Sequence, residues 1–387
     1  MSLRPATLRP KSLHPANPFP ASPLRATPLA ILLLTLLAAC QHPEKPVTEA
    51  EAIDFANKIE TSVALRNEQV LDNVIDPKYF AGLVLRQVND RFNFAFAAKA
   101  QAKIATLQMG ETVLKVVGRT GTYELVRHYI RDGHQHLLFR LIGEDGGLNY
   151  HDFELVHGDS SVRAVDLYNY GTGEQLSKTA TDILLEPGKL SRMTEAERDN
   201  HHLSREAQNY LTGGNPEEAW QFFVQLPDSI RKKQENQRLH VRIANKLGDS
   251  ARKAALQEYL TNYPQDPFIY LSTFTIDLNA KDFQSALLAL NKFETFLPTD
   301  PFLDFYRALI YKAMNDPLQS RLALERLHAR IPANFNVIAM LVDNEVYTGH
   351  PDSAAIVIRE ARAHKIVTPE QIEQAKTIYP SLRPYLK

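Results

Sequence analysis

A 34-residue period in the second half of the chain restricts the possible folds more than any other feature. Short turns rich in Gly, Asn, Asp and Pro recur at positions 215, 249, 282, 316 and 350, at intervals of 34, 33, 34 and 34 residues. Prolines at 264, 298 and 332 repeat at the same interval. The segments between the turns have a helical pattern. The period therefore indicates stacked helix–turn–helix units over 200–387, because a non-repeating bundle would not maintain this spacing.

The turn residues also predict how the second helix of each unit begins. Suitable N-cap residues stand at the turns, namely Asn215, Asp249, Asp282 and Asp316. A proline follows at the first helical position, where no N–H is needed, at Pro216, Pro317 and Pro351. The period and these positions resemble the tetratricopeptide repeat (TPR). His240, Phe274 and Val342 replace the small residue of the first helix, so the repeats are degenerate. We expect Gln371 to Ile378 to form a final capping helix.

The TPR resemblance implies an all-α superhelical array whose concave groove is lined by the first helices. Carried over by position, the candidate partner-binding residues are Phe268, Phe302, Phe305, Asn336 and Asp343, with Leu271 and Ala339 beside them. The Lys and Asn residues that clamp a peptide carboxylate in some family members are absent here, so we expect no such clamp. The alternative is that the aromatic residues close the groove against each other or pack on the N-terminal domain.

The chain has one cysteine, Cys40, which excludes an internal disulfide and a cysteine-based zinc site. It ends an apolar run that begins at Pro28, and this run of about 12 residues is shorter than the roughly 20 that span a membrane. Basic residues precede the run, and the first acidic residue is Glu44. This arrangement predicts a secretory signal over 1–39.

The sequence Leu37-Ala38-Ala39-Cys40 resembles the lipobox of bacterial lipoproteins. The resemblance implies cleavage before Cys40, a covalent diacylglycerol on its thiol and an N-acyl lipid on its amino group. We expect no other cofactor and no metal. Gln41 stands where Asp would resemble an inner-membrane retention signal, so an outer-membrane location in the cell envelope is expected. Residues 40–47 then form a tether. The alternative is a plain cleavable signal with an incidental cysteine.

Charge excludes one class of partner. The chain carries 44 basic and 45 acidic residues, so it lacks the basic excess that is typical of proteins that bind nucleic acid. Removal of residues 1–39 takes away four basic residues and no acidic ones, so the mature chain has a formal charge of 40 − 45 = −5.

The order of helical and strand patterns over 48–188 predicts an α+β domain with helices on one face of an antiparallel sheet. Three helices are expected, the first capped by Thr48 and Glu51, the second beginning at Asp76-Pro77, and the third over Phe92–Leu107. Turns at Asp132-Gly133, Asp145-Gly146-Gly147 and Gly158-Asp159 separate the expected strands. The strands are Val113–Val117, Thr122–Arg131, His136–Ile142, Leu148–His157 and Val162–Tyr170, and the strand pattern has ended by Pro187-Gly188.

This order of elements resembles the cone-shaped domains of the nuclear-transport-factor-two-like superfamily, which implies a pocket between sheet and helices. Two groups of residues are candidates for chemistry there. His128 and His136 with a carboxylate would suit a metal, but histidines near a hairpin tip on a solvated sheet face are the favoured explanation. Asp166 beside Tyr168 and Tyr170 would suit a general base, but a polar residue on an open face, or one bonded to a tyrosine hydroxyl, is the commoner case.

Two functions therefore compete. The first is a lipid-anchored, non-catalytic scaffold that binds a protein or peptide through the array. The second is an enzyme or small-ligand-binding protein that uses a pocket in the α+β domain. The second requires a solvent-connected pocket lined by polar groups, and a sheet face filled by apolar side chains would contradict it.

Overall fold

The computed structural model describes residues 45–87, 94–158, 161–297 and 300–386. Contacts group the chain into two units, residues 1–45 and 46–387, and the second unit is described below. Among the described residues no helix combines the length and the apolar character needed to cross a bilayer. The predicted signal, Cys40 and the first part of the tether lie outside the described residues.

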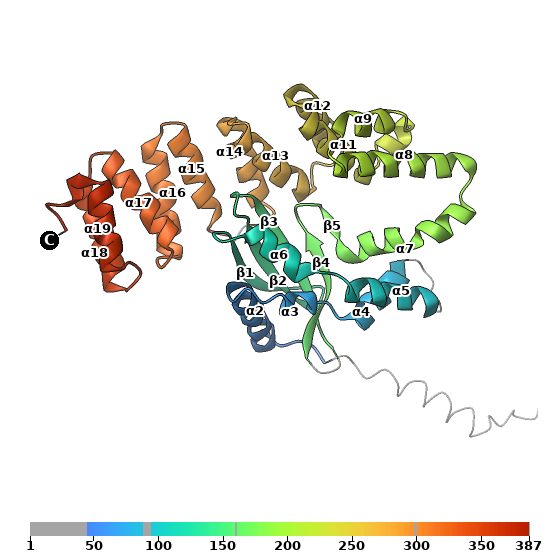
Figure 1. Ribbon diagram of the computed structural model, residues 1–387, viewed down its shortest axis with the longest axis horizontal. Helices are drawn as coiled ribbons and strands as arrows, with labels where there is room; N and C mark the ends of the chain where they lie inside the picture. The colour runs from blue at the N-terminus through green and yellow to red at the C-terminus, as the bar shows by residue number, and fades with distance from the viewer. Residues whose placement is uncertain (1–44, 88–93, 159–160, 298–299, 387) are drawn as a thin grey trace, which may run out of the picture. The chain divides into compact units, whose positions relative to one another are not determined.

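Within the described residues, five antiparallel strands form one sheet in sequential order (Figure 1). The turn at Asp132-Gly133 is confirmed, because both residues have positive φ, +51° and +83°, as a two-residue hairpin loop requires. The strands are β1 Thr122–Arg131, β2 His134–Ile142, β3 Leu148–His157, β4 Val162–Asn169 and β5 Glu174–Gln175.

The helices before the sheet cover one of its faces. Alternate β2 residues Leu137, Phe139 and Leu141 share a core with the apolar sides of these helices. The capping box between Thr48 and Glu51 begins the first of them as predicted. The helices are α2 Glu49–Ala64, α3 Gln69–Asp72, α4 Pro77–Gln87, α5 Phe94–Ala105 and α6 Met109–Val117, and α7 Leu176–Arg192 follows β5.

The opposite face of the sheet packs against the helical array. Leu138 and Tyr150 from the sheet share a second core with Phe274, Phe293 and Tyr306 of the array. The interpretation of this face as solvated is therefore wrong: His136 and Asp152 on it are buried. Because β2 is buried on both sides, nearly every residue in it is buried, which is typical of a strand between two layers.

After α7, the described residues form helix pairs with short turns at the predicted positions (Figure 1). Asp282 and Asp316 cap the helices that follow them, through the backbone N–H groups of Ser285 and Gln319. Asp249 is instead the first residue of its helix, and Gly248 occupies the cap position. The pairs are α8 Glu195–Thr212 with α9 Pro216–Val224, α11 Gln234–Leu247 with α12 Asp249–Asn262, α13 Pro267–Asn279 with α14 Phe283–Glu294, α15 Leu303–Ala313 with α16 Pro317–Arg330, and α17 Phe335–Tyr347 with α18 Pro351–Ala363.

Three shorter elements complete the array. The four-residue helix α10 Asp228–Arg231 lies between the first two pairs. The predicted capping helix is α19 Pro369–Ile378, and the turn η1 Pro380–Leu382 follows it.

One predicted element is wrong, and one helix was not predicted. Val113–Val117 is not a strand but the second half of helix α6, whose buried residues Val113, Leu114 and Val117 recur at helical spacing. Gly110 allows this helix to lie close to α3, because a Cβ there would come within 2.3 Å of the Glu68 carbonyl oxygen. Helix α7 was not anticipated, and it continues through Pro187-Gly188, by which the strand pattern has ended.

Side chains fill the middle of the helix-facing side of the sheet, and a cavity of about 560 Å³ lies beside them, between α2, the end of α6 and the start of β1. Tyr123 stacks on Phe139 with ring centroids 5.0 Å apart, and Phe153 meets Phe139 edge-on. Buried His151 lies beside them, with Nδ1 3.0 Å from the Tyr123 hydroxyl. Burial lowers the pKa of His151 to about 4, which keeps the imidazole neutral at pH 7.

We predict that stability falls in mild acid because of His151. Its pKa is near 6.5 when unfolded and about 4 when folded, so its contribution is complete above pH 6.5 and is lost as pH falls toward 4. The free energy of unfolding should drop by roughly 2 kcal/mol between pH 7 and pH 5 on this account. Denaturant unfolding at both pH values should show a smaller drop for His151→Gln, and an unchanged drop would contradict the assignment.

Candidate partner-binding site

The sheet covers part of the first-helix surface that was predicted to bind a partner. Phe268 at the start of α13 and Phe302 just before α15 are buried, whereas Phe305 is only partly buried. Phe302 and Phe305 stack on each other with centroids 4.8 Å apart. Tyr306 of α15 donates a hydrogen bond to the Gly146 carbonyl in the turn between β2 and β3. The alternative interpretation, packing on the N-terminal domain, therefore describes Phe302.

A buried ionic cluster centred on Asp300 joins sheet and array. Oδ1 of Asp300 accepts from Arg140 Nη1 of β2 at 2.6 Å, and Oδ2 accepts from the Tyr150 hydroxyl of β3 at 2.6 Å. The Arg140 guanidinium also lies 4.1 Å from the ring centre of Phe302. Burial, and then the nearby Asp300 carboxylate, raise the pKa of Tyr150, which stays a hydrogen-bond donor. These groups fix where the sheet meets α15.

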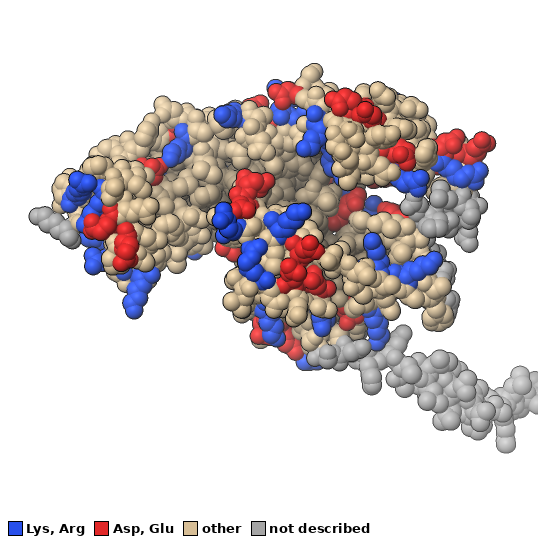
Figure 2. Space-filling view, viewed as in Figure 1, with Lys and Arg blue, Asp and Glu red and all other residues tan. Residues whose placement is uncertain are grey.

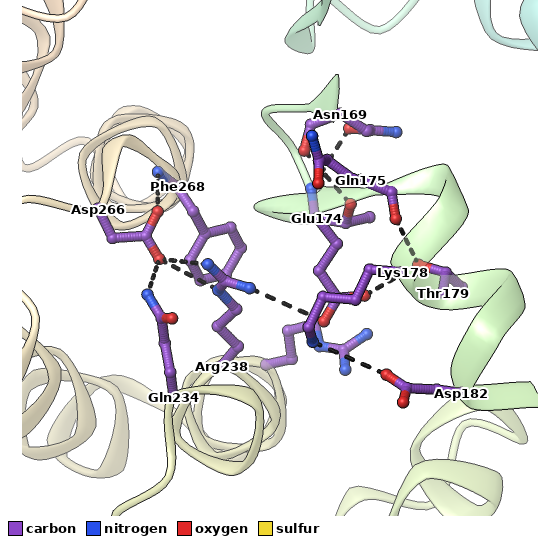
Figure 3. Close-up of polar contacts among 12 residues, drawn as sticks. Asn169, Glu174, Gln175, Lys178, Thr179, Asp182, Gln234, Arg238, Asp266 and Phe268 are labelled. Atoms are coloured by element: carbon purple, nitrogen blue, oxygen red, sulfur yellow. Dashed lines mark hydrogen bonds and ion pairs between the residues drawn. The ribbon is translucent and has the colours of Figure 1, made fainter. Parts of the chain in front are cut away.

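The same arrangement occurs one repeat earlier, around Asp266 (Figure 3). Asp266 accepts from Arg238 Nη2 at 2.7 Å and from the backbone N–H of Phe268 at 3.1 Å, just as Asp300 accepts from Arg140 and from the N–H of Phe302. Arg238 also lies 3.8 Å from Glu174 of β5, so this cluster ties the sheet to α11 and α13. Sequence reasoning missed both clusters, although the triplet Asp-Pro-Phe at 266–268 and 300–302, one period apart, marks them.

A cavity of about 330 Å³ remains where the edge of the sheet meets the array. Phe302, Phe305 and Asn336 line it, so the structure brings three of the five predicted residues together. Glu124 of β1 and Asp145 of the β2–β3 turn form part of the sheet side. Phe268 does not line this cavity, and neither does Asp343.

A second cavity, an apolar groove of about 410 Å³, lies between α17 and α19. Phe335 and Ile378 at its edges are 44% and 59% exposed. The polar side chains that line it are Gln371, Gln374 and Tyr379, and none of the described lining residues is charged. The other lining residues are Ile338, Ala339, Val342, Ile358, Val367, Ile372 and Ala375. A groove of this composition suits neutral, apolar side chains.

Asp343 is held by contacts within the array. Its Oδ1 accepts from the Tyr379 hydroxyl at 2.7 Å, and its Oδ2 accepts from Lys312 Nζ. Burial opposes ionisation of Asp343, but the hydrogen bonds from Lys312 and Tyr379 outweigh it and hold its pKa below the usual value. Asp343 therefore joins α15, α17 and the residue after α19, beside the groove.

The two histidines that were considered as metal ligands in the α+β domain do not lie together. His128 pairs across the strands with Leu137 and His136 with Tyr129, which places the two histidines on opposite faces of the sheet. The described residues contain no group of three His, Cys, Asp or Glu side chains that could hold a metal ion.

Asp166 supports the start of α7. It accepts from the Ser177 hydroxyl at 2.6 Å and from two backbone N–H groups, those of Leu167 and Ser177. Burial raises the pKa of Asp166, while these hydrogen bonds lower it. Its contacts are those of a structural carboxylate, and they replace the predicted tyrosine partner.

On the face of the molecule shown in Figure 2, acidic and basic side chains of the described residues are interspersed. No expanse of one sign covers the described part of this face, in keeping with the balanced composition.

No family model matches this chain, and no curated protein matches it. Among solved structures, a double mutant of MamA RS-1 is similar, with 18% identity and a TM-score of 0.35, over 43% of this chain and 93% of that one. MamA from residue 41 to its end, from Desulfovibrio magneticus RS-1, has the same identity and TM-score over 94% of its length. Another MamA mutant has 11% identity and a TM-score of 0.34. TM-scores of this size do not establish a shared fold.

Proposed function

We propose that the mature chain is a lipid-anchored, non-catalytic scaffold that binds a protein or peptide partner through its helical array. The array belongs, in this proposal, to the TPR-like class of repeats, and its 34-residue period supports that assignment. The anchor is a diacylglycerol and an N-acyl chain on Cys40, and the location is the outer membrane of the cell envelope. The lipobox-like sequence and Gln41 support these assignments.

The observation that carries the partner-binding role is the groove between α17 and α19. It is apolar, it opens to solvent beside Phe335 and Ile378, and no charged residue lines its described part. Its walls present residues at helical spacing, Phe335, Ile338 and Val342 on α17. The partner that fits is a neutral segment with apolar side chains on one face, such as an amphipathic helix.

The enzyme or small-ligand alternative is less well supported. It needs a pocket between sheet and helices whose polar groups are free to act on a ligand. A cavity of about 560 Å³ lies between α2, the end of α6 and the start of β1. Three of its charged lining residues already have partners: Glu60 accepts from the Leu125 N–H, Arg66 donates to the Gly118 carbonyl, and Glu124 pairs with Arg140. Asp166, considered as a general base, and His128 and His136, considered as metal ligands, already have structural partners.

We predict that a charge in the groove abolishes partner binding. A photo-crosslinking residue at Ala339 of the full chain, in cells, should give a specific adduct that mass spectrometry can identify. Phe335→Glu and Ile378→Glu should each reduce that adduct about 10-fold or more, because a carboxylate buried against apolar groups costs several kcal/mol. Both side chains are exposed at the groove edge, so the variants should still fold.

The matched control is Leu65→Glu, which places the same charge at an exposed leucine just after α2. It should leave the adduct unchanged. If the adduct fails to form, or if all three variants reduce it equally, the groove does not bind the partner.

A further inference from the structure

A row of exposed aliphatic side chains repeats along the second helices of the last three pairs. Leu288 of α14, Leu322 of α16 and Ile356 of α18 each stand six residues after the N-cap position and 34 residues apart. Leu318 lies one turn before Leu322. These side chains are 62%, 39%, 48% and 63% exposed in that order. We call the four residues the aliphatic row.

Packing within the array does not require the aliphatic row. Each of the three helices already buries another side: Leu287, Leu290 and Phe293 in α14, for example, belong to the core that the array shares with the sheet. The corresponding positions in the first two pairs are Gln221 and Ala254. Leaving large aliphatic groups in water is unfavourable, and exposed aliphatic groups that recur on successive helices suit an interaction surface.

We propose that the aliphatic row is the interface of a homodimer, in which two copies of this chain meet about a twofold axis that runs along α16. The aliphatic side chains recur once per repeat, so the surface that fits them best has the same 34-residue period. A second copy of this chain has such a surface. The axis sets Leu318 and Leu322 against the same residues of the second copy. It also sets Leu288 of α14 against Ile356 of α18 in the second copy.

The charges beside α14 and α18 support this pairing over the other twofold arrangement, and on α16 the exposed Arg321 and Glu325 pair with each other within one copy. Exposed lysines flank the row on the α14 side, Lys281 before the helix and Lys292 near its end. Exposed carboxylates flank it at the corresponding levels of α18, Asp352 near the start and Glu360 near the end. The axis along α16 brings lysines of one copy to carboxylates of the other, whereas an axis across the helices would set α14 against α14, lysine against lysine.

Arg359 is a further charge on α18, between the row and Glu360. Its guanidinium donates to the Tyr385 carbonyl oxygen at 2.9 Å, which turns it toward the C-terminal segment of its own chain. The carboxylates therefore remain the charges on α18 that suit the lysines of α14.

The test uses cysteine crosslinking of the full chain in cells, because the natural sequence has one cysteine, Cys40. Leu322→Cys should form a covalent dimer on mild oxidation. Leu288→Cys combined with Ile356→Cys should do so as well. Leu288→Cys alone should not, because the axis separates the two α14 helices. The unsubstituted chain and the exposed control Leu65→Cys should stay monomeric on the gel.

A second measurement guards against misfolded variants. The mass of the full chain in detergent, from light scattering, should be that of a dimer, and Leu322→Glu should reduce it by about half with an unchanged circular dichroism spectrum. A monomeric mass for the unsubstituted chain would overturn the proposal. So would a crosslink of Leu322→Cys to a different protein, or strong crosslinking by Leu288→Cys alone.

Discussion

Replacing Asp300 with alanine is expected to destabilise the protein by about 2–4 kcal/mol. The substitution removes the acceptor that the buried Arg140 Nη1 and the buried Tyr150 hydroxyl share, while Arg140 keeps Glu124 as an ion-pair partner. Buried donors that lose their acceptor cost more than an exposed pair, because water does not replace the lost interaction. Denaturant unfolding followed by circular dichroism measures the loss. We expect the transition to broaden or divide, since Asp300 joins the sheet to the array.

Two further variants show whether the loss of stability in Asp300→Ala comes from the buried cluster or from the removal of a carboxylate alone. Asp316→Ala removes an N-cap that bonds only the backbone of its own helix, and it should cost about 1 kcal/mol. Tyr150→Phe removes one of the two side-chain donors to Asp300 and should also cost about 1 kcal/mol. If Asp300→Ala costs no more than Asp316→Ala, the cluster does not hold sheet and array together.

Local patterns in the sequence predict most of the elements. The strand ends at Arg131 and His157 and the first-position prolines 216, 317 and 351 follow from turn and cap chemistry, which acts within a few residues. Helix α6 was mistaken for a strand because its apolar residues are nearly consecutive. Their helical spacing becomes informative only when Met109 and the exposed Val116 are included.

The packing of the array on the sheet depends on partners far apart in the sequence. Arg140 and Asp300 are separated by 160 residues, and nothing near either residue indicates the other. The same contact between sheet and array determines which of the predicted partner-binding residues are buried. It buries Phe302 against the sheet and leaves Phe305 and Asn336 beside a cavity. The groove between α17 and α19 lies where the sequence indicated Ala339, Asp343 and a capping helix, but not the groove itself. The two Asp-Pro-Phe triplets were the available signal.

Replacing Cys40 with serine should abolish lipid labelling completely. We propose that the thiol carries the diacylglycerol, and a hydroxyl does not replace it in that linkage. No other thiol exists in the chain to take the lipid. Because several acyl chains hold a protein at a bilayer far more firmly than one, the variant should accumulate as an uncleaved precursor or leave the membrane fraction. Metabolic labelling with a fatty acid, followed by membrane fractionation, measures both effects.

A matched variant separates lipidation from sorting. Gln41→Asp keeps the thiol, so its lipid label should equal that of the unsubstituted chain. It introduces the residue that resembles an inner-membrane retention signal, so the labelled protein should move from the outer-membrane to the inner-membrane fraction. A lipid label that persists in Cys40→Ser would refute the anchor. Because the groove between α17 and α19 uses none of these residues, the crosslink at Ala339 tests partner binding independently of the anchor.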